Sequence, residues 1–142
     1  MRGFVASRVS GGAAAATAVI RVLFGLFFVF FGLLKFIAHE LELAEFVRYG
    51  FPDSGLVVYL VGLLEMGAGL MLVLGLGTRL AAAGLAVVMA GAILTAGVRV
   101  GGWFHLGVAP TALAAMLYLL WAGAGSRALD GRLAGRAHPV SG

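Results

Sequence analysis

The sequence predicts an all-α integral membrane protein: a bundle of four transmembrane helices, with a short external interfacial helix between the first and the second. Of its 142 residues, 62% are hydrophobic and only 11% are charged, whereas soluble domains are nearer half apolar and a quarter charged. So few charges cannot cover so much apolar surface in water, and a lipid bilayer is therefore the expected solvent. Beta-barrel strands would show alternating polarity, which is not visible.

Four apolar runs are each long enough to cross the hydrocarbon core as a helix. They are Ala13–Ile37, Leu56–Leu76, Leu80–Val98 and Leu106–Ala124. The length allows one domain, so we expect a four-helix transmembrane domain over residues 13–126. Residues 1–12 would form a cytoplasmic N-terminal segment, and residues 127–142 a basic cytoplasmic tail.

The basic residues predict how the chain is oriented. One group of arginines lies near the termini and in the middle turn: Arg2, Arg8, Arg79, Arg127, Arg132 and Arg136. The opposite loops hold only Arg48 and Arg99, with Lys35 at a helix edge. Since loops rich in Lys and Arg stay on the cytoplasmic side, both termini are expected there, with the protein in the inner (plasma) membrane. The scattered basic residues do not predict nucleic-acid binding.

The first helix is followed by AHELELAEFVRYGFPDSG, the main external segment. Leu41, Ala44 and the pair Phe46–Val47 form a loose helical stripe, which predicts a short helix with its apolar side in lipid. Asp53 or Ser54 would then cap the second transmembrane helix.

Two turns join the later helices. GLGTR, residues 75–79, predicts a tight cytoplasmic turn that makes helices two and three an antiparallel hairpin. VRVGGWFH, residues 98–105, predicts an external turn whose Trp103 and Phe104 would anchor in the headgroup region.

Small residues recur every seven positions along the helices. Helix packing in lipid depends on close backbone approach, so this spacing predicts a compact left-handed bundle, although membrane helices are also simply rich in glycine. The spaced residues are Gly25 and Gly32, Gly55, Gly62 and Gly69, Gly84 and Gly91, and Gly107 with Ala114.

Charged residues inside the apolar runs are the strongest candidates for a site. Glu65 lies near the middle of the second run and needs a partner, because an unpaired charge at that depth costs ~2.5–3.5 kcal/mol or more. Arg21 and Lys35 share one face of the first helix. Since side chains lean toward their helix N-terminus, Lys35 is the favoured partner, with Arg21 close to the same seam. The cluster is either a structural polar staple or a small pocket for a head group, an anion or a proton.

The remaining polar and aromatic candidates are less specific. His105, at the outer mouth of the bundle, could shuttle protons or hydrogen-bond a quinone carbonyl, or simply be solvated. His39 and His138 are too scattered to form a metal site with it. Haem ligation by His39 and His105 would be unusual, because both lie near membrane ends. Without cysteine, the chain cannot itself run thiol–disulfide chemistry or hold a thiolate-ligated metal. Tyr59, Tyr118 and Trp121 could line an aromatic cavity, or belong to the bundle core or the lipid-facing surface.

An ordered set of short motifs resembles the DoxX family of small four-helix membrane proteins, from about residue 15 to residue 131. The motifs are Arg21 with Gly25, Gly32-Leu-Leu-Lys35, Gly50-Phe-Pro52, Gly62-Leu-Leu-Glu65 with Gly69, Gly75-Leu-Gly-Thr-Arg79, and Gly123-Ala-Gly125 before Ala128-Leu-Asp130. The family takes its name from a small subunit of a thiosulfate:quinone oxidoreductase. The resemblance therefore implies a redox-linked membrane complex without defining a reaction.

Three functions follow as hypotheses. The first is an accessory subunit of a quinone-linked oxidoreductase complex, with no intrinsic cofactor, in which Arg21, Lys35, Glu65 and His105 meet a quinone head group or an anionic sulfur substrate. The second is a non-catalytic assembly subunit of a larger membrane complex. The third is a small proton-coupled exporter, which a net positive pore-lining face argues against.

Overall fold

A computed structural model describes residues 2–135, and within them four helices are long and apolar enough to cross a membrane. These spans are Gly11–Ile37, Gly55–Leu74, Thr78–Gly97 and Phe104–Ala122. Each of their bounds lies within two residues of the predicted one. The predicted all-α fold with four membrane-spanning helices is therefore confirmed.

Two of the spans are not α-helical throughout. The elements are α1 (Arg2–Val5), α2 (Gly11–Ile37), α3 (His39–Arg48), α4 (Gly55–Leu74), α5 (Thr78–Ala92), η1 (Ile93–Gly97), η2 (Phe104–Val108), α6 (Ala109–Ala122) and α7 (Leu129–Gly135). The π-helical turns η1 and η2 flank the turn predicted to be external, and they contact each other. Such turns are rare and occur often at functional sites.

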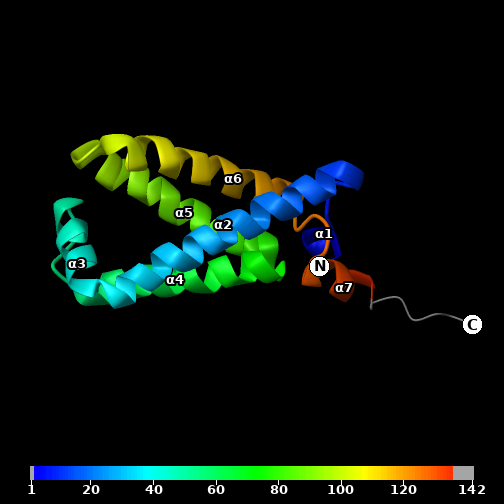
Figure 1. Cartoon of the computed structure of the whole chain (residues 1–142), viewed down its shortest axis with the longest axis horizontal. Coiled ribbons are helices and arrows are strands. Elements are labelled where there is room, and N and C mark those ends of the chain that lie inside the picture. The colour runs from blue at the N-terminus through cyan, green and yellow to red at the C-terminus, as the bar shows by residue number, and fades with distance from the viewer. Residues whose placement is uncertain (1, 136–142) are drawn as a thin grey trace, which may run out of the picture.

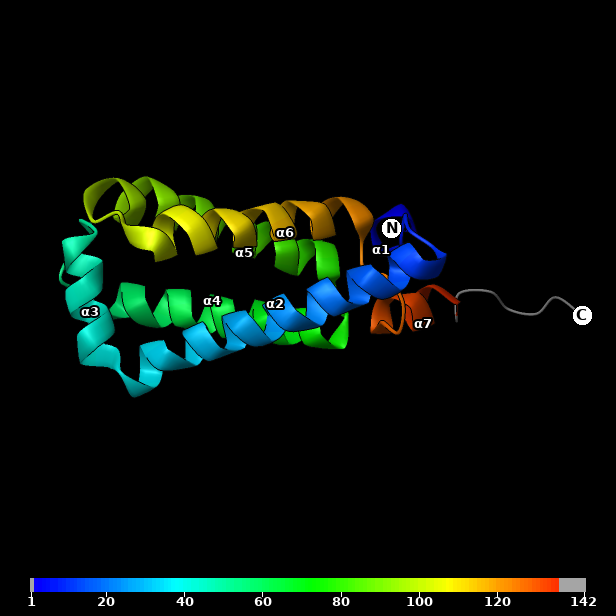
Figure 2. The same cartoon turned by 45° about the horizontal axis from the view of Figure 1, so that its top comes forward.

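The spanning helices form two pairs, α2 with α4 and α5 with α6. Figure 1 and Figure 2 show the pairs close together near α1 and α7, and diverging toward the end where α3 lies. The elements predicted to be cytoplasmic, α1, α7 and the α4–α5 turn, share one end. The bundle is thus wedge-shaped, with its wide end on the predicted external side.

Glycines explain why α2 and α4 pack so closely. A Cβ atom added to Gly25 would lie 2.8 Å from the carbonyl oxygen of Gly69, and one added to Gly32 would lie 2.8 Å from that of Gly62. The predicted close approach is therefore present at this seam. It is not present at Gly91 or Gly107, where an added Cβ would have no neighbour within 4 Å.

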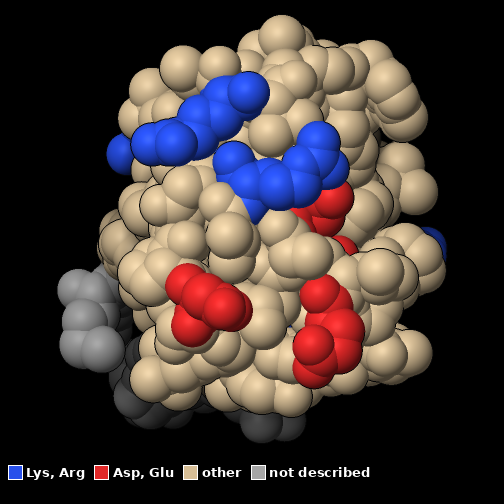
Figure 3. Space-filling model, turned by 90° about the vertical axis from the view of Figure 1, so that its left-hand side faces the viewer, with Lys and Arg blue, Asp and Glu red and all other residues tan. Residues whose placement is uncertain are grey.

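The short helix α3 closes the wide end of the wedge. Ala38 breaks the helix between α2 and α3, and Figure 3, which views this end, shows acidic and basic side chains there. Leu41 and Val47 are exposed as predicted, but Phe46 is buried. The prediction that Phe46 faces lipid is therefore wrong, because the diverging pairs leave an apolar space that its ring enters.

Two predicted local features also differ. Ser54 occupies the position before α4, but its side chain makes no capping hydrogen bond. Phe104 does not project outward with Trp103. Its ring lies 5.2 Å from that of Phe31 on α2, so it packs inside the wedge.

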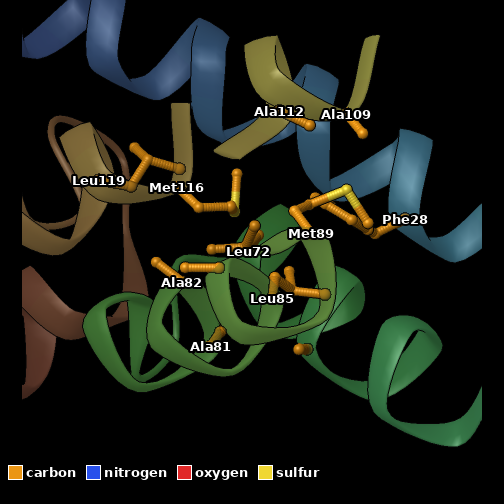
Figure 4. Packing of buried hydrophobic residues seen from close by; sticks show 12 residues of the cluster. Phe28, Leu72, Ala81, Ala82, Leu85, Met89, Ala109, Ala112, Met116 and Leu119 are labelled. Atoms are coloured by element: carbon orange, nitrogen blue, oxygen red, sulfur yellow. The ribbon is translucent and has the colours of Figure 1, made fainter. Parts of the chain in front are cut away.

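The hydrophobic core fills the narrow part of the wedge. Phe28, Leu72, Leu85 and Met116, one from each spanning helix, are fully buried and converge there (Figure 4). Toward the wide end, two members of the core, Met89 and Ala109, also line a cavity.

Side chains from distant parts of the sequence hold the narrow end together. Gly75 and Gly77 adopt left-handed backbone angles that make the predicted tight turn. The carboxylate of Asp130, in α7, accepts hydrogen bonds from the backbone N–H groups of Gly77 at 2.7 Å and Thr78 at 3.0 Å. Asp130 thus caps the N-terminus of α5, where a negative charge is favourable.

Candidate functional site

A cavity of about 440 Å³ lies at the wide end, between the two helix pairs and beneath α3. Its walls are mostly apolar and include Phe27 and Phe31 of α2, Phe46 of α3 and Phe104 of η2. The polar side chains that line it are Lys35, Glu42, Tyr49, Glu65, Thr95 and His105. An apolar cavity of this size with a few convergent polar groups has the usual character of a small-molecule site.

The predicted pairing of Glu65 with Lys35 is present at the wall of this cavity. Lys35 Nζ lies 2.9 Å from Glu65 Oε2, and the two side chains are only 8% and 5% exposed. Glycines opposite each residue make room for the pair. A Cβ on Gly62 would lie 2.9 Å from Lys35 Cβ, and one on Gly32 would lie 3.1 Å from Glu65 Cβ. The α2–α4 seam is therefore shaped to hold both charges.

A second carboxylate, Glu42 on α3, approaches the same ammonium. Its Oε2 lies 3.5 Å from Lys35 Nζ, and its side chain is 24% exposed. Lys35 also donates a hydrogen bond to the carbonyl oxygen of Phe31 and lies 5.8 Å from the centre of the Phe46 ring, within cation–π distance. Sequence reasoning missed Glu42, because only the break at Ala38 turns α3 back over Lys35.

His105 and Tyr49 form another part of the lining. His105 Nδ1 donates to the carbonyl oxygen of Gly101 at 3.2 Å, which leaves Nε2 as the nitrogen available to a ligand. The Tyr49 ring lies edge-on to the imidazole, at 5.1 Å. Burial, reinforced by the negative charge of Glu45, raises the pKa of Tyr49 to about 12. A tyrosine hydroxyl is already protonated at neutral pH at its ordinary pKa of about 10, and this shift keeps the Tyr49 hydroxyl a donor at higher pH as well.

Arg21 is not part of this cluster, so its predicted place beside Lys35 and Glu65 is wrong. It does lie in the α2–α4 seam, but roughly 21 Å from Lys35 along α2. Its guanidinium donates to the carbonyl oxygens of Leu72 and Val73, at the end of α4, and of Ala124. Buried arginine here satisfies carbonyl groups that a helix end leaves unpaired.

Because Arg21 lies outside the site, the net charge of the site differs from the predicted one. Within the described residues, the cavity lining holds two carboxylates and one ammonium rather than an excess of positive charge. The expected positive pore-lining face is therefore not found.

The other aromatic and histidine candidates lie away from the cavity. His39 stacks on Tyr59 with ring centres 3.9 Å apart and donates from Nδ1 to the carbonyl oxygen of Lys35. Tyr118 shares a 2.7 Å hydrogen bond with Thr17, and Trp121 is exposed. His138 lies outside the described residues. Within residues 2–135, His, Asp and Glu side chains form no group of three that could hold a metal ion.

Comparison with known proteins gives two matches. Residues 16–98 match the family described as DoxX. The chain is also 36% identical over 132 residues to the uncharacterized membrane protein Rv3486 of Mycobacterium tuberculosis (strain ATCC 25618 / H37Rv), a similarity that covers 83% of this chain and 81% of that protein. No solved structure matches.

Proposed function

The chain belongs to the DoxX family, and from this we propose that it is an accessory subunit of a membrane-bound, quinone-linked oxidoreductase complex. The cavity beneath α3 would be its head-group site. The observation that carries the proposal is a buried acid–base pair, Lys35 with Glu65, at the wall of an apolar cavity inside a membrane protein.

The cavity suits a flat, weakly polar ring in size and lining. Aromatic rings of Phe31, Phe46 and Phe104 offer stacking surfaces, and the volume lies within the range of small-molecule pockets. The Lys35 ammonium would donate to a carbonyl oxygen of the head group in place of one of its two longer contacts, each 3.5 Å, with Glu42 or with the Phe31 carbonyl oxygen. His105 Nε2 would supply a second polar contact to the head group.

A bound quinone would supply two-electron, two-proton chemistry. The chain's own residues would position the head group, exclude water through the phenylalanine lining, and hold or accept protons at Glu65 and His105. Electron exchange would involve a redox group on a partner subunit, which makes the partner part of the proposal.

A direct test is the binding of a short-chain quinone to the protein in lipid nanodiscs. Lys35→Met should weaken binding by about 10-fold to 100-fold, since a hydrogen bond from a charged group is lost. Gly91→Leu should abolish binding, because Gly91 lines the cavity and a leucine side chain there would extend into the free space beside it. Gly67→Leu is the matched control: Gly67 has equal free space but does not line the cavity.

The same variants separate this proposal from the alternatives. Quinone-dependent activity with a purified partner should be lost in Glu65→Gln, and normal activity in that variant would remove the idea. A stable partner without quinone binding would favour a non-catalytic assembly subunit. Binding of a lipophilic cation in place of a quinone would favour a proton-coupled exporter, which the two carboxylates of the lining could serve.

A further inference from the structure

Three charged side chains of the cavity lining form a continuous row that runs from the partly exposed α3 side to the buried α2–α4 seam. Their exposure falls in order, from 24% for Glu42 through 8% for Lys35 to 5% for Glu65. The ammonium nitrogen lies between the carboxylates, 3.5 Å from one and 2.9 Å from the other. We propose that this row is a proton path that connects the cavity with the α3 side of the membrane, with Glu42 as its outer end.

The transfer balances as an acid–base exchange. A protonated Glu65 gives its proton to Lys35, while the Lys35 ammonium gives one of its three protons to the Glu42 carboxylate. Lysine is an ammonium before and after, so the net change is one proton moved from Glu65 to Glu42. No oxidant or reductant is needed, and the reverse sequence carries a proton inward.

The groups around the row favour proton exchange on the α3 side rather than toward the narrow end. Glu45, the next acidic residue of α3, forms an ion pair with Arg48 at 2.6 Å. Arg48 is therefore occupied by Glu45 and does not pair with Glu42. Toward the other end of the molecule lies the fully buried core of Phe28, Leu72 and Met116, which offers no polar group for proton transfer.

Two other titratable side chains face the same cavity, His105 from η2 and Tyr49 from the segment after α3. Tyr49 stays protonated at neutral pH. His105 lies across the cavity from the row and is the group that could exchange protons with a bound ligand independently of Glu65.

The purpose of the path, exchange of protons with a bound head group, rests on the proposed function, but its existence can be tested without any ligand. The experiment is time-resolved infrared spectroscopy of the whole protein in nanodiscs after a light-released proton. The Glu65 carboxyl band is assigned by its loss in Glu65→Gln. Nanodiscs expose both faces of the protein, so a proton that had another route to Glu65 could still use it. A slower Glu65 band in a Glu42 variant would therefore mean that the row is the main route.

Glu42→Gln should slow the appearance of the Glu65 band on the order of 100-fold, the scale of a positioned proton-transfer group. Glu40→Gln, a change at an exposed residue of the same helix, should leave the rate unchanged. An unchanged rate in Glu42→Gln would overturn the path. So would the absence of any Glu65 carboxyl band over the pH range in which the protein stays folded.

The outcome is separable from that of quinone binding. If Glu42→Gln slows the band while the wild-type protein binds no quinone, the path stands and the proposed function fails. If quinone binds but the rate is unchanged, the path fails and the proposed function stands.

Discussion

At the scale of single residues, the buried ion pair of Lys35 and Glu65 determines the charge and the stability of the cavity wall. Two charges taken out of water lose several kcal/mol of solvation each, and their mutual attraction roughly compensates. The pair therefore contributes little to the free energy of unfolding. Removing one partner would nevertheless destabilise the protein strongly, because the other partner would be left as a buried, uncompensated charge.

We accordingly expect Lys35→Met to lower the free energy of unfolding by about 3–5 kcal/mol, because Glu65 loses its counter-ion. The double variant Lys35→Met/Glu65→Gln should recover most of that loss, since the only carboxylate left without Lys35 is Glu42, whose side chain is 24% exposed to solvent. Denaturant unfolding in detergent micelles measures both. A double variant as unstable as the single one would show that the pair is not the cause.

The exposed pair Glu45–Arg48 provides the control for burial. Their side chains are 41% and 59% exposed despite a contact distance of 2.6 Å. Glu45→Gln should therefore change the free energy of unfolding by about 0–1 kcal/mol. A loss as large as that of Lys35→Met would contradict burial as the source of the difference.

At the scale of elements, two features position the site: the glycine contacts between α2 and α4, and the capping of α5 by α7. The first brings the charged faces of α2 and α4 together, and the second fixes the narrow end from which the helix pairs diverge. The first depends on glycines, whose lack of a side chain lets the two backbones approach. The second depends on backbone N–H groups that a side chain from another helix reaches.

Neighbouring glycines of α4 should respond to substitution in opposite directions. A Cβ on Gly69 would lie 2.8 Å from the Gly25 carbonyl oxygen, so Gly69→Ala should destabilise by about 1–3 kcal/mol. Gly67 has no neighbour within 4 Å, and Gly67→Ala should stabilise the helix by roughly 0.5–1 kcal/mol. Thermal unfolding in detergent orders the two variants against wild type. Equal effects would mean that the α2–α4 contact is not tight.

The cap on α5 predicts a cost at a residue far away in sequence. Asp130→Ala removes the acceptors for the N–H groups of Gly77 and Thr78, and should lower stability by about 1–2 kcal/mol. The control Asp53→Ala changes an exposed aspartate and should stay within about 0.5 kcal/mol of wild type. A similar loss in both would argue against capping.

At the scale of the whole molecule, the stabilising contacts and the candidate site lie at opposite ends of the wedge. The narrow end holds the buried Arg21 and Arg79, the Asp130 cap and the apolar core. The wide end holds the cavity, the π-helical turns and the α3 cover. We expect the narrow end to face the cytoplasm, on the basis of its arginines.

The absence of cysteine makes this orientation simple to measure. Ser10→Cys lies near the narrow end and Asp53→Cys at the wide end, and both positions are exposed. A membrane-impermeant maleimide applied to intact cells should label the second variant and leave the first unlabelled until the cells are opened. Labelling of Ser10→Cys alone would invert the assignment.

Sequence reasoning found two of the three charged residues of the site, Lys35 and Glu65. The mid-helix position of Glu65 demanded a partner, and the lean of side chains toward helix N-termini selected Lys35. It failed for Arg21, because a position on the same helix face does not reveal that unpaired carbonyl groups at the end of α4 would bind the guanidinium. It missed Glu42 because the direction of α3 after Ala38 is a tertiary fact.

The apolar composition and the lengths of the four runs determined the fold class by themselves, since a bilayer admits few ways to satisfy a backbone within it. The glycine spacing determined that helices could approach closely. Only the tertiary structure decided where they do so, because contact depends on both surfaces of a seam. It placed the tight seam at α2–α4, left the other helices to diverge, and so created the space into which Phe46, Glu42 and His105 turn.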